Sequence, residues 1–241
     1  MSSAVQKQSL PDELIFNYKF LFSGDKEKTF NIRIDKDSLN VIRSKAEVPP
    51  EWAKLKSFKC IHCPLDENKH EYCPLAVNLS GVISFFSDLS SFEKVDIIID
   101  TGVRQIRKNT SMHKGVSSLL GVLMVSSDCP VMGKLKPMMR FHLPFASIEE
   151  TEYRVLSMYL LAQFFLWKKG KTPDWEMKNL VDIYSDIKIL NRNVCKKISE
   201  IESRDTSINA VVMLNNFAEH VTFILNKKIL DKIEVLFKDY F

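Results

Sequence analysis

The chain has 241 residues, of which 45% are hydrophobic and 27% are charged, and it carries 16 phenylalanines against 7 glycines and 9 prolines. This composition excludes a disordered, collagen-like or coiled-coil protein and supplies enough apolar mass for a sizeable core. The formal net charge of +4 is too small to indicate a nucleic-acid or membrane partner by itself.

The N-terminal residues lack the basic and apolar regions of a signal peptide, and the longest apolar runs are too short to span a bilayer. We therefore expect a cytoplasmic protein without a membrane span. In such a reducing compartment, clustered thiols are metal ligands or redox groups more often than structural disulfides.

The first part of the chain, to about residue 110, predicts two β-hairpins separated by a helix and a long cysteine-rich loop. In chain order, the expected elements are strands over 14–22 and 29–34, a short helix over 36–44, a helix over 74–86, and strands over 95–100 and 103–108. Four antiparallel strands are thus available for one sheet.

The remainder, 111–241, is expected to be helical. Ser147 and Glu150 have the spacing of a capping box, and Thr172 followed by Pro173 is typical of a helix start. The expected helices cover 112–126, 147–169 and 172–201, with a last one that begins near 206. We predict an α+β fold with a small antiparallel sheet of about four strands and a predominantly helical C-terminal part, in a single domain over 1–241.

Four cysteines carry the most specific chemical signal. Cys60 and Cys63 form a CxxC pair, which can place two thiolates on one ion, and Cys73 and Cys129 would complete a set of four. Because proline follows Cys73 and Cys129, both are expected at helix N-caps, where free N–H groups stabilise a thiolate. We predict that the four converge on a metal. Cys195 stands apart on an apolar helical stripe and is expected to pack instead.

The spacing of these cysteines leaves the metal open. Sulfur donors favour zinc, Cu(I) or an iron–sulfur cluster; zinc is the default for a closed site, and an iron–sulfur cluster is the alternative. Further candidate ligands are His62, His70, His142, Met132, Met138 and Met139. The interpretation without metal makes Cys73 and Cys129 small buried residues before proline-initiated helices, and the CxxC a redox pair or a pair without a role.

Residues 101–147 form a basic segment, with seven Lys and Arg against the single acid Asp128. This local excess of charge is larger than that of the whole chain and predicts a site for a phosphate or carboxylate. The residues expected to form it are Arg104, Arg107, Arg140 and His142. We place Arg140 and His142 on one side of an extended segment, with Phe141 pointing into the core.

The alternative for this segment is a solvated face on which Arg140 pairs with Glu149 or Glu150. Aromatic residues that could stack on bases are sparse there, so nucleic acid is not expected as a partner. His113 and His142 lie in the same stretch of sequence.

A family resemblance rests on several motifs: CIHCPL, YCPLAVNL, SSLLGVLMVSSDCP, and LKPMMRFHLPFASIEETEYR followed by SMYLLAQFF. These resemble an uncharacterised bacterial protein family that is catalogued as a domain of unknown function, over nearly the whole chain. The resemblance implies Cys-Pro motifs at Cys63, Cys73 and Cys129 and an Arg-Phe-His-Leu-Pro-Phe block at 140–145. It also implies a glycine where Asp128 stands and a glutamine where His113 stands. It implies no activity, cofactor or substrate.

Three hypotheses about function follow. The first is a cytoplasmic binding or regulatory module in which a Cys-rich site, with zinc favoured, clamps the N-terminal region to the helical part. The second is an enzyme or redox sensor in which a metal or iron–sulfur cluster lies next to Arg140 and His142 and acts on an anionic small molecule. The third is a protein-interaction module without metal. The sequence leaves open whether the protein is an enzyme.

Overall fold

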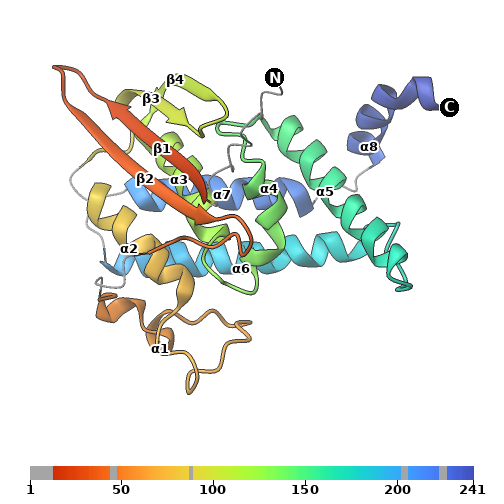
Figure 1. Cartoon of the computed structure of the whole chain (residues 1–241), viewed down its shortest axis with the longest axis horizontal. Coiled ribbons are helices and arrows are strands. Elements are labelled where there is room, and N and C mark those ends of the chain that lie inside the picture. The colour runs from red at the N-terminus through yellow and green to blue at the C-terminus, as the bar shows by residue number, and fades with distance from the viewer. Residues whose placement is uncertain (1–12, 44–47, 87–88, 202–205, 223–226) are drawn as a thin grey trace, which may run out of the picture.

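The computed structural model describes residues 13–43, 48–86, 89–201, 206–222 and 227–241 (Figure 1). Two β-hairpins form one four-stranded antiparallel sheet. Strand β1 (Glu13–Leu21) pairs with β2 (Glu27–Asp35), and β3 (Lys94–Asp100) pairs with β4 (Gln105–Ser111). Strands β1 and β3 lie side by side in the centre, which gives the order β2-β1-β3-β4.

One face of this sheet is buried. Phe16, Tyr18 and Phe20 of β1 and Ile97 and Ile99 of β3 are almost fully buried, while the residues between them are more exposed. This alternation is the two-residue period of a strand with one face on the core. The helices therefore cover one face of the sheet.

Two helices pack directly on that face. Helix α2 (Pro74–Phe86) reaches it through Phe86, whose ring centroid is 5.0 Å from that of Phe20. Helix α3 (Met112–Val125) approaches still more closely at Gly115, where a Cβ atom would overlap the side chain of Ile97 and lie 2.8 Å from Cε1 of Phe20. Only glycine permits this distance between helix and sheet.

The remaining long helices form a layer behind α3 (Figure 1). Helix α7 (Thr206–Thr222) packs against both α3 and α6 (Lys178–Ile201), and α5 (Ile148–Lys168) contacts α7. The shorter elements are η1 (Glu51–Ala53), α1 (Leu55–Phe58), η2 (Met132–Leu135), α4 (Lys136–Arg140), α8 (Lys227–Glu234) and η3 (Val235–Tyr240). The buried residues of sheet and helices form one hydrophobic cluster.

The predicted α+β class is confirmed, with a four-stranded antiparallel sheet and a helical C-terminal part. The capping box of α5 is also confirmed. The Glu150 N–H donates to Ser147 Oγ at 3.1 Å, and the Ser147 N–H donates to Glu150 Oε2 at 2.7 Å. Both patterns are local in sequence, which is why they could be predicted.

The short helix predicted over 36–44 is wrong over its described part, since residue 44 lies outside the described residues. The Asp35 carboxylate accepts hydrogen bonds from the N–H and hydroxyl of Ser38, both at 2.7 Å, and closes a turn instead. Leu39 then adopts a φ of 57°, and Val41 forms a bridge to Ile34. The side chain of Asp35 thus competes with the helix.

The helix predicted to start at Thr172 begins six residues later, at Lys178. Asp174 accounts for the shift, because its Oδ2 accepts hydrogen bonds from the Asn179 N–H and the Tyr159 hydroxyl, both at 2.8 Å. The carboxylate therefore satisfies an N–H at the helix start and ties it to α5. The short helices α4 and α8 were not predicted.

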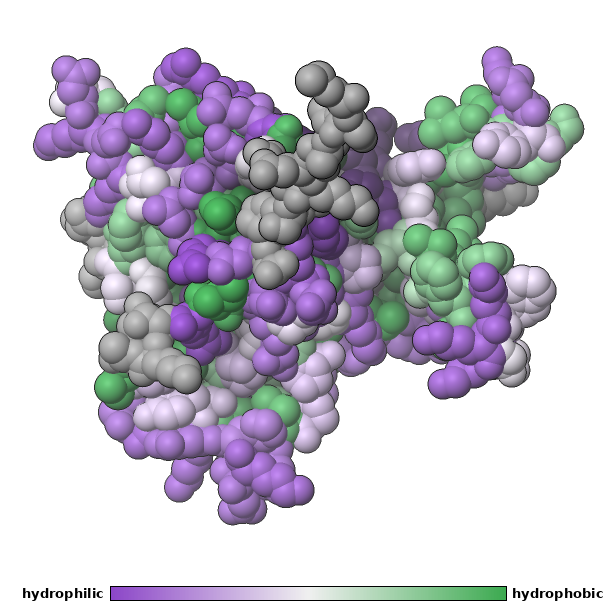
Figure 2. Space-filling model, viewed as in Figure 1, coloured by the Kyte–Doolittle hydropathy of each residue, from purple (hydrophilic) through white to green (hydrophobic). Residues whose placement is uncertain are grey.

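Apolar side chains also gather on part of the surface. Figure 2 shows them over the C-terminal half of α5, where Leu161, Phe164, Phe165 and Trp167 are exposed. Within the residues that the structure describes, no helix has the length and apolar character needed to cross a membrane.

Replacing Gly115 by alanine tests the close packing of α3 on the sheet. We expect the free energy of unfolding to fall by about 1–3 kcal/mol, because the methyl group forces Ile97 and Phe20 to move. Gly121 is the matched control on the same helix, since its added Cβ would meet its nearest neighbour, Leu214 Cδ2, at 3.7 Å. Gly121→Ala should be neutral or stabilise by up to about 1 kcal/mol. Urea unfolding measures both, and equal effects of the two variants would contradict the packing argument.

Candidate functional site

The structure brings four cysteines to one small cavity. Cys60, Cys63, Cys73 and Cys129 all line it, and their thiols are free. The other lining residues are apolar: Phe58, Pro64, Leu65, Pro74, Leu75, Val131, Leu190 and Val194. The cavity has a volume of about 20 Å³, which is room for one water-sized sphere.

The ends of the cysteine-rich loop are held together by the backbone. The Cys73 N–H donates to the Ala53 carbonyl at 2.9 Å, and the Leu55 N–H donates to the Glu71 carbonyl at 2.8 Å. Helix α1 begins at Leu55 and leads to Cys60, and the Cys63 N–H then donates to the Cys60 carbonyl at 3.0 Å. These bonds explain why the CxxC pair lies near Cys73.

Cys129 reaches the same cavity from the end of α3. Asn78 of α2 donates through Nδ2 to the carbonyls of Leu123 at 2.8 Å and Ser126 at 3.2 Å, which fixes the end of α3 beside α2. Asp128 then adopts a φ of 63° and directs the chain toward the cavity. This left-handed conformation favours glycine, although aspartate also adopts it.

Hydrogen-bond donors surround three of the four sulfurs. The N–H groups of Leu75 and Ala76 donate to Cys73, and those of Val131 and Met132 donate to Cys129. Asn193 of α6 lies with Nδ2 3.4 Å from the sulfur of Cys60. Cys73 directly precedes α2, as the N-cap prediction requires, whereas Cys129 precedes a turn that leads into η2. N–H donors stabilise a thiolate in either setting.

Burial favours the neutral thiol at three of these cysteines, Cys60, Cys73 and Cys129. Burial raises the pKa of Cys60 to about 12 and that of Cys73 to about 11, and burial also raises the pKa of Cys129. Neighbouring cysteines contribute to the rise at Cys60, which is further evidence that the sulfurs lie close together. Binding a cation at this cavity would therefore release protons.

The other candidate ligands differ in position. His62 lies between the CxxC cysteines, and both of its ring nitrogens are buried without a hydrogen-bond partner among the described residues. His70 is exposed, and His142 lines a different pocket, as do Met132, Met138 and Met139. Across the described ranges, no group of three or more His, Cys, Asp and Glu side chains already has the arrangement of a metal site.

Cys195 does not line the cysteine cavity. It is half-buried on α6, where its side chain packs against the hydrophobic core, and burial raises its pKa to about 11. It serves as a natural comparison for the four cavity cysteines because it is the fifth free thiol of the same chain.

The residues of the predicted anion site do not come together. Arg104, Arg107 and Arg140 are exposed, and Arg107 forms an ion pair with Asp96 at 3.0 Å. His142 lines a second, larger cavity, whereas Arg104, Arg107 and Arg140 line neither this cavity nor the cysteine cavity. The extended geometry expected at 140–142 is not found, because Arg140 ends helix α4 and the chain turns there instead of continuing as a strand.

The side chain of Phe141 also lies elsewhere than the extended segment predicted. Its side chain is 75% exposed instead of pointing into the core, and the guanidinium of Arg140 lies 5.5 Å from its ring centroid. The alternative pairing of Arg140 with Glu149 or Glu150 is not found among the described residues either, and the Glu150 carboxylate accepts the Ser147 N–H of the capping box. His113 bonds to Ser91 and lines neither cavity.

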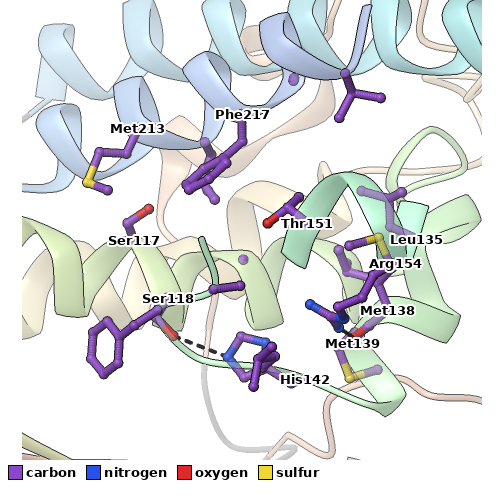
Figure 3. Close-up of a pocket in the computed structure, with 18 of the residues that line it drawn as sticks. Ser117, Ser118, Leu135, Met138, Met139, His142, Thr151, Arg154, Met213 and Phe217 are labelled. Atoms are coloured by element: carbon purple, nitrogen blue, oxygen red, sulfur yellow. Dashed lines mark hydrogen bonds between the residues drawn. The ribbon is translucent and has the colours of Figure 1, made fainter. Parts of the chain in front are cut away.

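A second, larger pocket lies between the helices, with a volume of about 480 Å³. Figure 3 shows Met213 and Phe217 of α7 opposite His142, with Arg154 of α5 beside Met138 and Met139 of α4. Its walls are mainly apolar. Among the described residues that line it, the charged ones are Lys108, Lys114 and Arg154, and none is acidic.

His142 is held in this pocket as a neutral ring. Its Nε2 lies 3.1 Å from the hydroxyl of Ser118 (Figure 3). The hydroxyl of Tyr18 lies 3.0 Å from the same nitrogen. Burial lowers its pKa to about 3, and the nearby guanidinium of Arg154 contributes to the decrease. With a pKa this low, the ring is uncharged near neutral pH.

Arg154 is a basic residue of the larger pocket that the sequence does not single out. Its Nη2 donates to the carbonyls of Met138 and Phe141, both at 2.9 Å, which holds the guanidinium at the pocket wall. In the sequence it lies four residues after Glu150, which is typical of an exposed helical ion pair. Asn193, beside Cys60, carries no sequence signal either, since an asparagine within a long helix has many roles.

The low pKa of His142 makes stability depend on pH. The unfolded chain takes up a proton near the ordinary histidine pKa of 6.5, whereas the folded chain does so only near about 3. The free energy of unfolding should therefore decrease below about pH 6.5, with a slope of at most about 1.4 kcal/mol per pH unit from this residue. His142→Gln should remove that part of the slope in urea unfolding at about pH 7 and about pH 5. His70→Gln, at an exposed position, should keep it; equal slopes in all three proteins would contradict the assignment.

The comparisons with known proteins give one match. No curated protein and no solved structure matches the chain. A family model described as a domain of unknown function, DUF6901, matches residues 16–238, which include all four cavity cysteines and every residue that lines the larger pocket. The chain therefore belongs to the DUF6901 family.

Proposed function

We propose that this protein is a binding module with a structural zinc site formed by Cys60, Cys63, Cys73 and Cys129. The single observation that carries the proposal is that the four thiols, from three separate segments of the chain, line one cavity. Such a site fits a reducing compartment such as the cytoplasm, where free thiols persist.

The chemistry of the cavity favours one zinc ion over a larger cofactor. Four thiolates are a complete tetrahedral ligand set for zinc, with Zn–S distances of about 2.3 Å. A volume of about 20 Å³ holds a single ion, whereas an iron–sulfur cluster would require the walls to move apart. The N–H donors to Cys73 and Cys129 support thiolates as ligands.

A structural role for the metal agrees with what surrounds it. Four cysteine ligands leave no open position for a substrate, and the remaining walls are apolar. The enzyme or redox-sensor hypothesis requires a metal next to Arg140 and His142, and neither residue lines this cavity. The ion would join the cysteine-rich loop, the start of α2 and the segment after α3, with Leu190 and Val194 of α6 against them.

Metal analysis of anaerobically purified protein tests the proposal. We expect one zinc per chain and no iron–sulfur absorption in the visible range. Cys73→Ser should lose the metal, because Cys73 lines the cavity and its sulfur accepts hydrogen bonds from two N–H groups. Cys195→Ser is the matched control and should keep it, since Cys195 lies outside the cavity. Zinc-free wild-type protein, or equal zinc in both variants, would overturn the site.

Removal of zinc should also lower the melting temperature. With free zinc at about 1,000 times Kd, binding contributes about 4 kcal/mol to the stability of the folded state. For a chain of this length that corresponds to a decrease of about 8–16 °C on chelation. Calorimetry with and without a chelator measures the shift, and Cys73→Ser should show none. A shift of similar size in Cys73→Ser would mean that the chelator acts elsewhere.

A further inference from the structure

We propose that the larger pocket binds a small molecule with an apolar body and one carboxylate, which Arg154 holds. This names the ligand class of the proposed binding module; it rests on that binding role and is independent of zinc. The pocket is separate from the cysteine cavity, although Met132 lines the pocket and its N–H bonds to Cys129.

The charge and size of the pocket favour a small anionic ligand. Its volume of about 480 Å³ lies within the range of small-molecule sites. Three basic residues and no acidic residue line it, as far as the described chain extends, and most of the other lining residues are apolar. A ligand that fits both properties has a negative group on an apolar body.

The hydrogen bonds and burial of Arg154 leave part of its guanidinium for a ligand. Two backbone carbonyls engage Nη2, and no carboxylate forms an ion pair with this guanidinium among the described residues. The side chain is half-buried, so its charge is partly removed from water, and Glu150, one turn earlier on α5, contributes only a longer-range attraction. Nε and Nη1 remain available, and a planar guanidinium matches a carboxylate with two parallel hydrogen bonds. The two carbonyls hold the group in place for such a ligand.

The side-chain oxygen of Asn191 is a second polar group of this pocket that could contact a ligand. Asn191 of α6 lines the pocket and is 2% exposed, and its Oδ1 has no hydrogen-bond partner within the described ranges. Buried carbonyl oxygens without a donor are uncommon in folded proteins, and a hydroxyl or amide on a ligand would satisfy this one. Arg154 and Asn191 thus provide two polar contacts in an otherwise apolar site.

The apolar part of the ligand is a flexible chain. Four of the lining residues are methionines, Met132, Met138, Met139 and Met213. Methionine side chains are unbranched and adjust to the shape of what they contact. They fit an aliphatic chain of variable conformation better than one rigid ring system. A medium-chain fatty acid is therefore the simplest probe of this chemistry.

Calorimetric titration with dodecanoate, dodecanol and dodecyl phosphate, each below its micelle concentration, tests the assignment. We expect wild-type protein to bind dodecanoate more tightly than dodecanol, which lacks the charge. Arg154→Met should weaken dodecanoate binding by about 10- to 100-fold and change dodecanol binding by less than about 2-fold. Arg140→Met is the matched control, because Arg140 is exposed and outside the pocket, and it should bind like wild type. Dodecyl phosphate binding more tightly than dodecanoate would overturn the choice of a carboxylate.

A second variant keeps the test valid if Arg154→Met fails to fold. Gly121 lines the pocket, and a larger side chain there would reduce its volume. Gly121→Leu should fold, as checked by circular dichroism, and should lose binding of both dodecanoate and dodecanol. Absence of dodecanoate binding by wild type, or full binding by Gly121→Leu, overturns the proposal. If the protein contains zinc but does not bind dodecanoate, only the assignment of the larger pocket is refuted. If the protein binds dodecanoate but contains no zinc, only the metal site is refuted.

Discussion

The close packing of α3 on the sheet at Gly115 is the constraint on which the rest of the structure depends. Because the helix has no side chain at this point, Ile97 and Phe20 of the two central strands can lie directly against it. The opposite side of α3 packs against α7. The helix therefore sets the distance between the sheet and the helical layer. Its middle part contributes Ser117 and Ser118 to the larger pocket, and the segment that follows it carries Cys129 into the cysteine cavity.

The two cavities are neighbours with different chemistry. Helix α6 contributes to both, with Leu190 and Val194 at the cysteine cavity and Ile187 and Asn191 at the larger pocket. Sulfur and apolar carbon line the smaller one, which suits a single soft cation. Basic groups and apolar carbon line the larger one, which suits an amphipathic anion. The same core thus separates two cavities of different chemistry, and the exposed Arg104, Arg107 and Arg140 line neither of them.

The sequence predicts what depends on local patterns and misses what depends on the tertiary fold. The hairpins follow from alternation, the capping box from the offset of Ser147 and Glu150, and the cysteine set from its residue type. Asp174 delays the start of α6 through a contact with Tyr159 on another helix, which no local pattern contains. Arg154 has the spacing of a surface ion pair and only the fold shows that it faces a pocket. The apolar periodicity of α6 likewise gives no sign that Asn191 is buried beside that pocket.

Because Cys129 comes from a distant part of the chain, the chain cannot be shortened to the cysteine-rich loop without loss of one thiol of the cavity. A peptide that covers residues 58–75 contains three of the cavity cysteines, but Cys129 follows only after α2, the second hairpin and α3. The cysteine-rich loop is therefore not an autonomous module of the zinc-finger kind, in which one short segment supplies every ligand. Its complete ligand set exists only once the central strands, which pair Tyr18 with Ile99, have closed a long loop of chain. The cavity is a property of the whole fold, and an excised loop would retain its CxxC pair without the geometry that gives the pair its partners.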